Sequence, residues 1–298
     1  MRSGSKKSLV RLLLATLLIP LCLQCSDDKS TDNKTDKITL KQVGALSGLS
    51  ARDVVIAGHY AYVADDAQVL VVVDISNRTA PSIVGALGRT GGENGVALSV
   101  AGQYAYVAVE ADGMYIVDVS QAAAPTKVGV FNEAYAKDVV VVGNYAYIAD
   151  QDFGLRIVDI TNPASPVLTG SCQSAEPFGV SLSGTYAYCA DSDSGLCIID
   201  IANPAAPVVA GKYRGLESAR TVEALAGNVF LDDDEVGPVI LNVADPANPL
   251  LISRYQGQCE HLKVFSDHIY VSYFGGLAAI DISDLVHPVL ADTVSVST

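Results

Sequence analysis

Short apolar runs separated by turn-forming residues recur along most of the chain. Residues 138–171 contain four such runs, at Asp138–Val142, Tyr145–Ala149, Leu155–Ile160 and Val167–Ser171. The segments between them are rich in Gly, Asn, Asp and Pro, which are the residues that tight turns require. Four strands of about five residues with their turns fill about 40 residues. The pattern predicts a four-stranded antiparallel sheet.

This unit is repeated six times. Its closing proline falls at Pro81, Pro125, Pro166, Pro207, Pro249 and Pro288. The third run of each copy ends in Asp74, Asp118, Asp159, Asp200, Asn242 or Asp281. A parallel β-helix would need shorter coils, and a helical repeat would show apolar stripes of period 3.6. Sheets packed radially bury both of their faces, so we predict an all-β fold, a six-bladed β-propeller over residues 38–298.

The third runs read VLVVVDI, MYIVDV, LRIVDI, LCIIDI and LAAIDI. Together with the Asn-Pro and the second proline that follow, they resemble the LVIVD repeat. The resemblance covers about residues 40–298 and is weakest in the fifth copy, which reads VILNVADPANP. It implies an extracytoplasmic β-propeller, a family whose members usually have no assigned reaction.

Two segments compete for the place of the strand that completes the ring. Ile38–Leu46 resembles the fourth strand of a blade, and so does the C-terminal PVLADTVSV. One of them is expected to close the ring, while the other lies outside it or extends the blade. The sequence leaves both alternatives open.

The N-terminal region predicts export. Residues 1–24 carry four cations followed by an apolar run over residues 12–23, the pattern of a signal peptide. Cys25 follows directly and resembles the lipidated cysteine of bacterial lipoproteins, although Gln24 is unusual before it; an ordinary cleaved signal is the alternative. Residues 25–37 are polar and are expected to form a flexible tether. We therefore expect an outer-membrane lipoprotein of the cell envelope that faces the periplasm or the surface.

The charge balance restricts the kinds of partner. The chain has 19 Lys+Arg and 33 Asp+Glu, for a formal charge of −14. Loss of the four leader cations leaves 15 against 33, or −18. Such a protein lacks the basic surface that nucleic-acid binding needs. We expect a monomer that contacts the membrane only through its lipid.

Residues present in every copy are expected to be structural. The carboxylate that ends the third run, such as Asp159, is placed to accept hydrogen bonds from its own turn. The paired tyrosines, such as Tyr145 and Tyr147, are expected to pack one face of the sheet. His59 and His268 are expected to face solvent.

Residues that differ between copies are better candidates for function, and those at the channel mouth are the most accessible. The candidate ligand-binding residues are Arg52, Asp53, Glu93, Asn94, Lys137, Asp138, Glu176, Arg220, Glu260 and His261. Twelve carboxylates of the loops between second and third strands would surround them as an acidic collar. The collar is interpreted as a solvated rim, as a site for a cationic ligand or basic protein patch, or as a calcium site. The metal candidates are Asp150, Asp152, Asp191 and Asp193, which lack the full spacing of a calcium loop.

The cysteines give one specific hypothesis. Cys189 and Cys197 are symmetric about Asp193 in a predicted hairpin, so a disulfide is one interpretation and two buried thiols the other. Cys172 and Cys259 are expected to stay unpaired.

The preferred function is a binding or scaffolding module for a protein or polar ligand of the cell envelope, bound at the channel-side face. The sequence has no nucleophile elbow, P-loop or dinucleotide fingerprint, and no residue is assigned as catalytic. The alternative is a calcium-dependent hydrolase or lyase that holds its metal with the carboxylates above the channel. Convergence of Asn94, Asp138, Glu176 and Glu260 would favour the enzyme.

Overall fold

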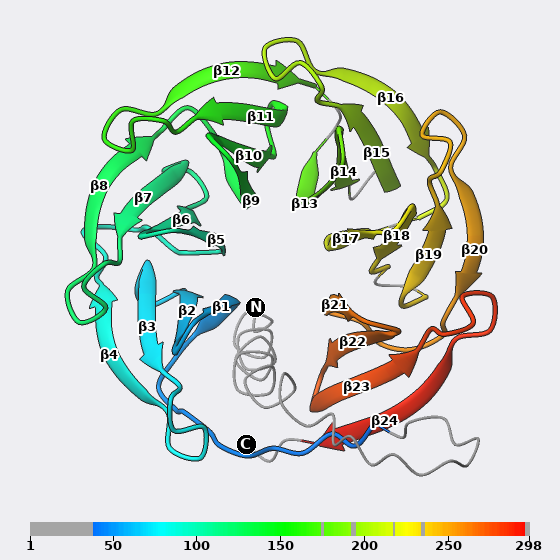
Figure 1. Ribbon diagram of the computed structural model, residues 1–298, viewed down its shortest axis with the longest axis horizontal. Coiled ribbons are helices and arrows are strands. Elements are labelled where there is room, and N and C mark those ends of the chain that lie inside the picture. The colour runs from blue at the N-terminus through cyan, green and yellow to red at the C-terminus, as the bar shows by residue number, and fades with distance from the viewer. Residues whose placement is uncertain (1–37, 174–175, 192–194, 217, 234–235, 296–298) are drawn as a thin grey trace, which may run out of the picture.

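Six four-stranded antiparallel sheets are arranged in a ring around one axis (Figure 1). The computed structural model describes residues 38–173, 176–191, 195–216, 218–233 and 236–295. The prediction of a six-bladed β-propeller is confirmed, and each blade is built from one continuous stretch of chain. The signal peptide, Cys25, the tether and Asp193 lie outside the described residues. No helix in the described part of the chain is long and apolar enough to cross a membrane.

The strands run from the ring axis outward in the order of the sequence. The innermost strands are β1 (Ala51–Ala57), β5 (Ala97–Ala101), β9 (Ala136–Val142), β13 (Pro177–Ser183), β17 (Val222–Leu225) and β21 (His261–Phe265). The second strands are β2 (Tyr60–Asp65), β6 (Tyr104–Ala108), β10 (Tyr145–Asp150), β14 (Tyr186–Asp191), β18 (Asn228–Leu231) and β22 (His268–Tyr273). The third strands are β3 (Leu70–Asp74), β7 (Met114–Asp118), β11 (Gly154–Asp159), β15 (Gly195–Asp200), β19 (Val239–Asn242) and β23 (Gly276–Asp281). The outer strands are β4 (Ser82–Leu87), β8 (Thr126–Phe131), β12 (Val167–Cys172), β16 (Val208–Tyr213), β20 (Leu250–Arg254) and β24 (Val289–Ser295).

The second and third strands of each blade form the core. They are buried along almost their whole length. Neighbouring blades cover both faces of blades 2–5, and the facing sides of blades 1 and 6 pack instead against leucines of the N-terminal segment, Leu46 and Leu49 on blade 1 and Leu40 on blade 6. This explains why their sequences are continuously apolar instead of alternating. The fifth blade keeps all four strands despite its divergent sequence.

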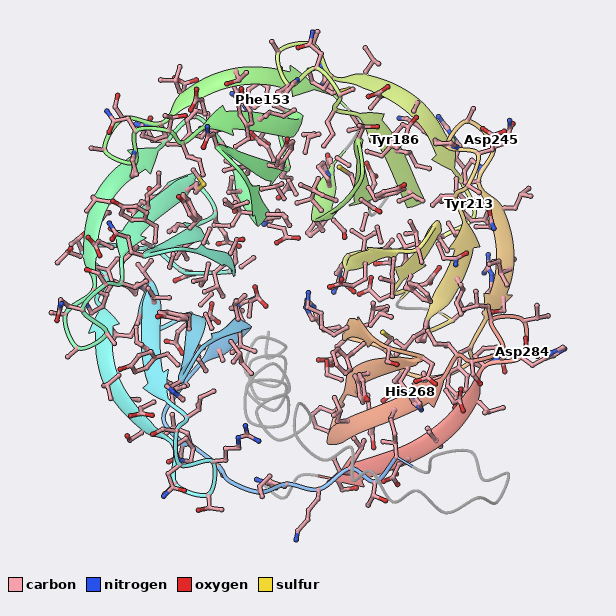
Figure 2. All side chains as sticks on the ribbon, in the orientation of Figure 1. Phe153, Tyr186, Tyr213, Asp245, His268 and Asp284 are labelled. Atoms are coloured by element: carbon pink, nitrogen blue, oxygen red, sulfur yellow. The ribbon has the colours of Figure 1, made fainter. Side chains whose placement is uncertain are left out.

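The aromatic pairs lie on the second strands. Tyr60 and Tyr62 contact each other edge to face, with ring centroids 6.4 Å apart. His268 takes the corresponding first position in blade 6, where its side chain is buried and stacks on Tyr270 (Figure 2). Its Nδ1 atom lies 2.7 Å from Asp267 Oδ1. The prediction that His268 faces solvent is therefore wrong. His268 pairs with Asp281 as Tyr60 pairs with Asp74, so it belongs to the strand, whereas His59 precedes the strand and is exposed.

The turn after each third strand confirms the structural role of the repeated acid. In every copy its side-chain oxygen accepts a hydrogen bond of 2.8–3.0 Å from the backbone N–H two residues later. These six residues are Asp74, Asp118, Asp159, Asp200, Asn242 and Asp281. They hold the turns that carry the chain to the outer strands.

Neighbouring blades interlock through a glycine of the outer strand. A Cβ atom added to Gly129 would lie 1.9 Å from the Pro163 carbonyl oxygen of the next blade. Gly85 and Gly211 have the same close approach, at 2.1 Å from Ala122 O and 2.0 Å from Pro246 O. The outer strand of one blade thus packs directly on a backbone turn of the next.

The Gly129→Ala variant should lose about 1–3 kcal/mol of unfolding free energy, because the added methyl group must push two blades apart. Chemical denaturation of this variant and of Gly143→Ala would measure the loss. A Cβ at Gly143 meets no atom within 4 Å, so that control reports only the strain of a positive φ. A loss at Gly129 no larger than the loss at Gly143 would contradict the interlock.

The ring is closed by the N-terminal segment, residues 38–46, which we call the strap. β24 completes blade 6, while the strap runs outside it toward blade 1 without forming a strand (Figure 1). The Leu40 N–H donates to Asp292 Oδ2 at 2.7 Å, and the Leu40 side chain is buried against Tyr270 and Leu277. Gly44 approaches the Arg78 carbonyl as the outer-strand glycines approach theirs. Asp292 stands where blades 1–4 have that glycine, so the strap supplies the contact that blade 6 lacks.

Candidate functional site

One face of the ring, the loop face, carries the connectors that enter the innermost strands and the loops between second and third strands. Side-chain contacts link the two sets. Arg52 Nε lies 2.6 Å from Asp66 Oδ1, and Lys137 Nζ lies 3.4 Å from Glu110 Oε1. The opposite face, the turn face, carries the repeated turns described above.

Several carboxylates of the predicted acidic collar point into the protein. Asp65, Asp150 and Asp191 are buried, and each accepts the backbone N–H of a residue fifteen positions earlier in the preceding connector, at 2.5, 3.2 and 3.0 Å. Asp232 accepts the N–H groups of Arg220 and Thr221 at 2.7 and 2.6 Å. These aspartates fasten the two loop sets together. The exposed collar is therefore smaller than the sequence predicts.

This arrangement gives two of the four metal candidates a structural role. Asp150 Oδ1 accepts three backbone N–H groups, and Oδ2 lies 2.7 Å from Arg156 Nε in an ion pair. Asp191 fastens its connector in the same way, and Asp152 is exposed. Among the described residues, no group of three or more His, Cys, Asp or Glu side chains is placed to hold a metal ion.

Two of the predicted channel-side residues, Glu93 and Asn94, are held by hydrogen bonds with the loops around them. Glu93 folds back onto its own loop, where it accepts hydrogen bonds from the Thr90 and Gly91 N–H groups and the Thr90 hydroxyl. These bonds lower the pKa of Glu93 to about 2. The hydrogen-bond network orients the Asn94 amide so that its nitrogen donates to the Asp66 and Glu93 carbonyls, at 3.2 and 3.3 Å. Glu176 is exposed.

Around the ring axis, side chains of one innermost strand accept backbone N–H groups of the next. Asp53 accepts the Leu98 N–H at 2.9 Å, and Asp138 accepts the Val180 N–H at 2.8 Å. Two even-numbered blades use serine, which sits two residues further along: Ser99 accepts from Val141 at 3.2 Å and Ser181 from Ala224 at 3.0 Å. We call these four bonds the girdle. Because the axis-facing edge of an innermost strand has no neighbouring strand, the girdle satisfies N–H groups that would otherwise lack a partner.

Blades 5 and 6 replace the girdle residues with different chemistry. By register with β1 and β9, Thr221 and His261 stand where blades 1 and 3 have aspartate. Glu223 and Lys263 stand at the serine position and form an ion pair across the blade interface. Burial lowers the pKa of Lys263, but the negative charges of Glu223, Asp53 and Asp138, in that order, together raise it above its usual value. The axis therefore holds a mixed cluster with an excess of negative charge.

Sequence reasoning missed Glu223 and Lys263. The available signal was their departure from the residues at equivalent positions in the other innermost strands. Of the residues that were predicted, Asp53 and Asp138 line the axis. Three others, Arg220, Glu260 and His261, are half-buried at the starts of β17 and β21. The cations Arg52 and Lys137 lie at the starts of β1 and β9.

Burial and the nearby Asp53 charge raise the pKa of Asp138 from 3.8 to about 7, against the opposing effects of its two backbone hydrogen bonds and Lys263. A pKa raised by folding stabilises the protein most below the unfolded value, and this contribution is lost as pH rises through about 7. Asp138→Asn should therefore gain stability relative to wild type as pH rises from 5 to 8. Thermal unfolding at several pH values would measure this difference.

Asp118→Asn is the matched control for that measurement. Hydrogen bonds from Ser120 lower the pKa of Asp118, so this carboxyl is ionised in both states between pH 5 and 8. Its difference from wild type should not change in that window. A flat difference for Asp138→Asn as well would contradict the raised pKa.

A second group of residues missed from the sequence lies on blade 3. Arg156 is buried on β11 at a position where the other third strands have Val71, Tyr115, Cys197, Val239 and Ala278. It contacts Asp150 and Glu133, at 2.7 and 3.9 Å, and its guanidinium lies 4.4 Å from the centre of the Phe153 ring. Here too the signal was a departure from the repeat.

The cysteines of blade 4 lie opposite each other. Cys189 and Cys197 are register partners, and both are fully buried as thiols. Burial raises the pKa of Cys197 to about 11 and that of Cys189 well above its usual value. Cys172 packs in the same cluster, and it and Cys259 are also thiols. The disulfide stays a prediction, and thiols this buried and this weakly acidic react slowly in the folded protein.

Comparison with known proteins identifies the repeat. The profile of the LVIVD repeat matches residues 48–87, 94–133, 134–174, 178–214 and 256–296. These matches correspond to blades 1, 2, 3, 4 and 6, and they leave out the divergent blade 5. A comparison with curated protein sequences found no match.

Solved structures of similar fold come from diverse proteins. The periplasmic gluconolactonase PpgL of Pseudomonas aeruginosa superposes with a TM-score of 0.72 at 12% identity, over 86% of this chain and 88% of that one. A functionally unknown protein of Desulfotomaculum acetoxidans gives 0.69 at 13% identity, over 87% and 90%. The β-propeller domain of Cps50 (Swd1) of Myceliophteria thermophila gives 0.66 at 14% identity, over 84% and 87%. At these identities the likeness concerns the fold alone.

Proposed function

Because the chain belongs to the LVIVD-repeat family, we propose that it is an exported, lipid-anchored binding or scaffolding module. Its ligand surface in this proposal is the loop face, where it takes a protein or polar ligand of the cell envelope. A β-propeller built from repeats fits such a module, since its rigid ring presents many adaptable loops on one face.

One observation carries the choice of face. The turn face repeats the same hydrogen-bonded turn in all six blades. Departures from the repeat, by contrast, gather on the loop face and the axis, at Arg156, Glu223, Lys263 and His261. Repeats that serve only the fold need no such differences between copies.

Site-specific photo-crosslinking in the native cell tests the proposal. A benzophenone side chain is placed at Phe153 or Phe274 on the loop face, and at Phe265 or His287 on the turn face, all of which are exposed. An adduct of constant mass from the loop-face positions alone supports the proposed surface. Adducts from the turn face alone, or from none of the positions, contradict it.

Anchoring is tested separately at Cys25. Lipidation there would make the protein incorporate a labelled fatty acid and sediment with membranes, and Cys25→Ser would abolish both. Unchanged labelling and sedimentation of the variant would contradict a lipid at this residue without affecting the choice of face.

A further inference from the structure

The loop face of blade 3 carries a surface whose aromatic and charged side chains are layered. Phe153 is 51% exposed at the loop between β10 and β11 (Figure 2). Exposed carboxylates accompany it at Asp152, the preceding residue, and at Glu133, whose Oε2 lies 3.9 Å from Arg156 Nη1. We call Phe153, Asp152 and Glu133, together with the cations Arg156 and Lys137, the blade 3 sector.

The cations of the sector lie beneath its surface. The Arg156 side chain is only 9% exposed and is held by Asp150 and Glu133. The Lys137 side chain is 15% exposed, pairs with Glu110, and lies 4.4 Å from the centre of the Tyr135 ring and 5.6 Å from that of Phe178. The outermost groups are therefore a phenyl ring and carboxylates.

Arg156 fixes the position of the exposed ring. Its Cζ atom lies 4.4 Å from the centre of the Phe153 ring, and its Nε lies 2.7 Å from Asp150 Oδ2. The equivalent position is apolar or aromatic in the other five blades, so this buried cation is a feature of blade 3 that the repeat does not require. A side chain held in one orientation loses little entropy when a partner packs on it.

We propose that the blade 3 sector docks a basic segment of a partner protein, with the aliphatic part of an arginine or lysine on Phe153 and its charge among the surrounding carboxylates. The inference rests on the proposed function, because it names the partner chemistry for one sector of the same face. Charge complementarity carries it: the exposed charges of the sector are negative, and the whole chain is acidic. Aromatic anchors within a charged rim are the usual energetic centres of protein interfaces.

Fluorescence anisotropy with a labelled (Arg-Gly-Leu)₄ peptide tests the inference. The peptide should bind wild type at 50 mM NaCl and bind more weakly at 300 mM, since salt screens the charges. Phe153→Ala should weaken binding about fivefold or more. Phe265→Ala removes a ring that is 61% exposed on the turn face and should leave binding unchanged.

The two phenylalanine variants keep the same net charge, so general attraction between an acidic protein and a basic peptide cannot separate them. Equal affinity of both variants would overturn the proposal. Equal binding of (Glu-Gly-Leu)₄ by wild type would do so too, as would binding of maltohexaose, but not of the basic peptide, through Phe153. If the peptide fails while loop-face crosslinks are obtained in cells, the partner chemistry is wrong and the proposed function stands.

Discussion

The Asp150→Ala variant is expected to lose about 3–5 kcal/mol of unfolding free energy. The substitution removes the acceptor of three backbone N–H groups and leaves the buried Arg156 guanidinium without its closest counter-ion. Breaking a buried ion pair by removing one partner costs this much because the remaining charge stays out of water. Chemical denaturation followed by circular dichroism would measure the loss.

Two variants separate the contributions to that loss. Asp150→Asn keeps an acceptor oxygen for the backbone but removes the charge beside Arg156, so its loss should be intermediate. Asp152→Ala changes an exposed neighbour in the same loop and should stay within about 0.5 kcal/mol of wild type. A loss for Asp150→Ala as small as that for Asp152→Ala would show that the Asp150–Arg156 ion pair does not stabilise the folded protein.

Removal of the strap is expected to cause the second large loss of unfolding free energy. A chain that begins at residue 48 lacks Leu40 and Gly44, and it therefore leaves Tyr270 and Leu277 uncovered and Asp292 without its backbone donor. Removal of one buried leucine side chain alone costs about 2–5 kcal/mol. We expect the shortened chain to unfold at clearly lower denaturant concentration than a chain beginning at residue 38.

Point variants locate the effect within the strap. Leu40→Ala should reproduce most of the loss, and Asp292→Ala a smaller part. Lys41→Ala, at an exposed position, is the matched control and should be neutral. If the two chain lengths are equally stable, the strap does not close the ring.

The architecture was predictable from the sequence because the features that determine each blade are local and recur in every copy of the repeat. Each apolar run forms one strand, and each acid that ends a third run, such as Asp159, accepts a hydrogen bond within its own turn. These are local relations that recur in every copy. Register therefore follows from the spacing, and the facing of Cys189 and Cys197 was predictable for the same reason.

The candidate site was less predictable because its contacts join distant residues. Whether Asp150 binds a metal ion or holds two loops together depends on the position of Arg156 and on the backbone N–H of Tyr135. Likewise, Glu93 could not be recognised as folded onto its own loop until the Thr90 hydroxyl was placed. Residue type indicated the carboxylates, but only packing showed which of them turn inward.

The girdle has a consequence for how the ring can be built. Its aspartate and serine bonds alternate, so blades 1 and 2 match blades 3 and 4 as pairs. Every donor in these bonds is a backbone N–H group, which any inserted blade also has, and each acceptor belongs to the preceding blade alone. A duplicated blade therefore continues the girdle with one aspartate or serine of its own, and a ring of this kind can gain or lose single blades without leaving an innermost strand unbonded.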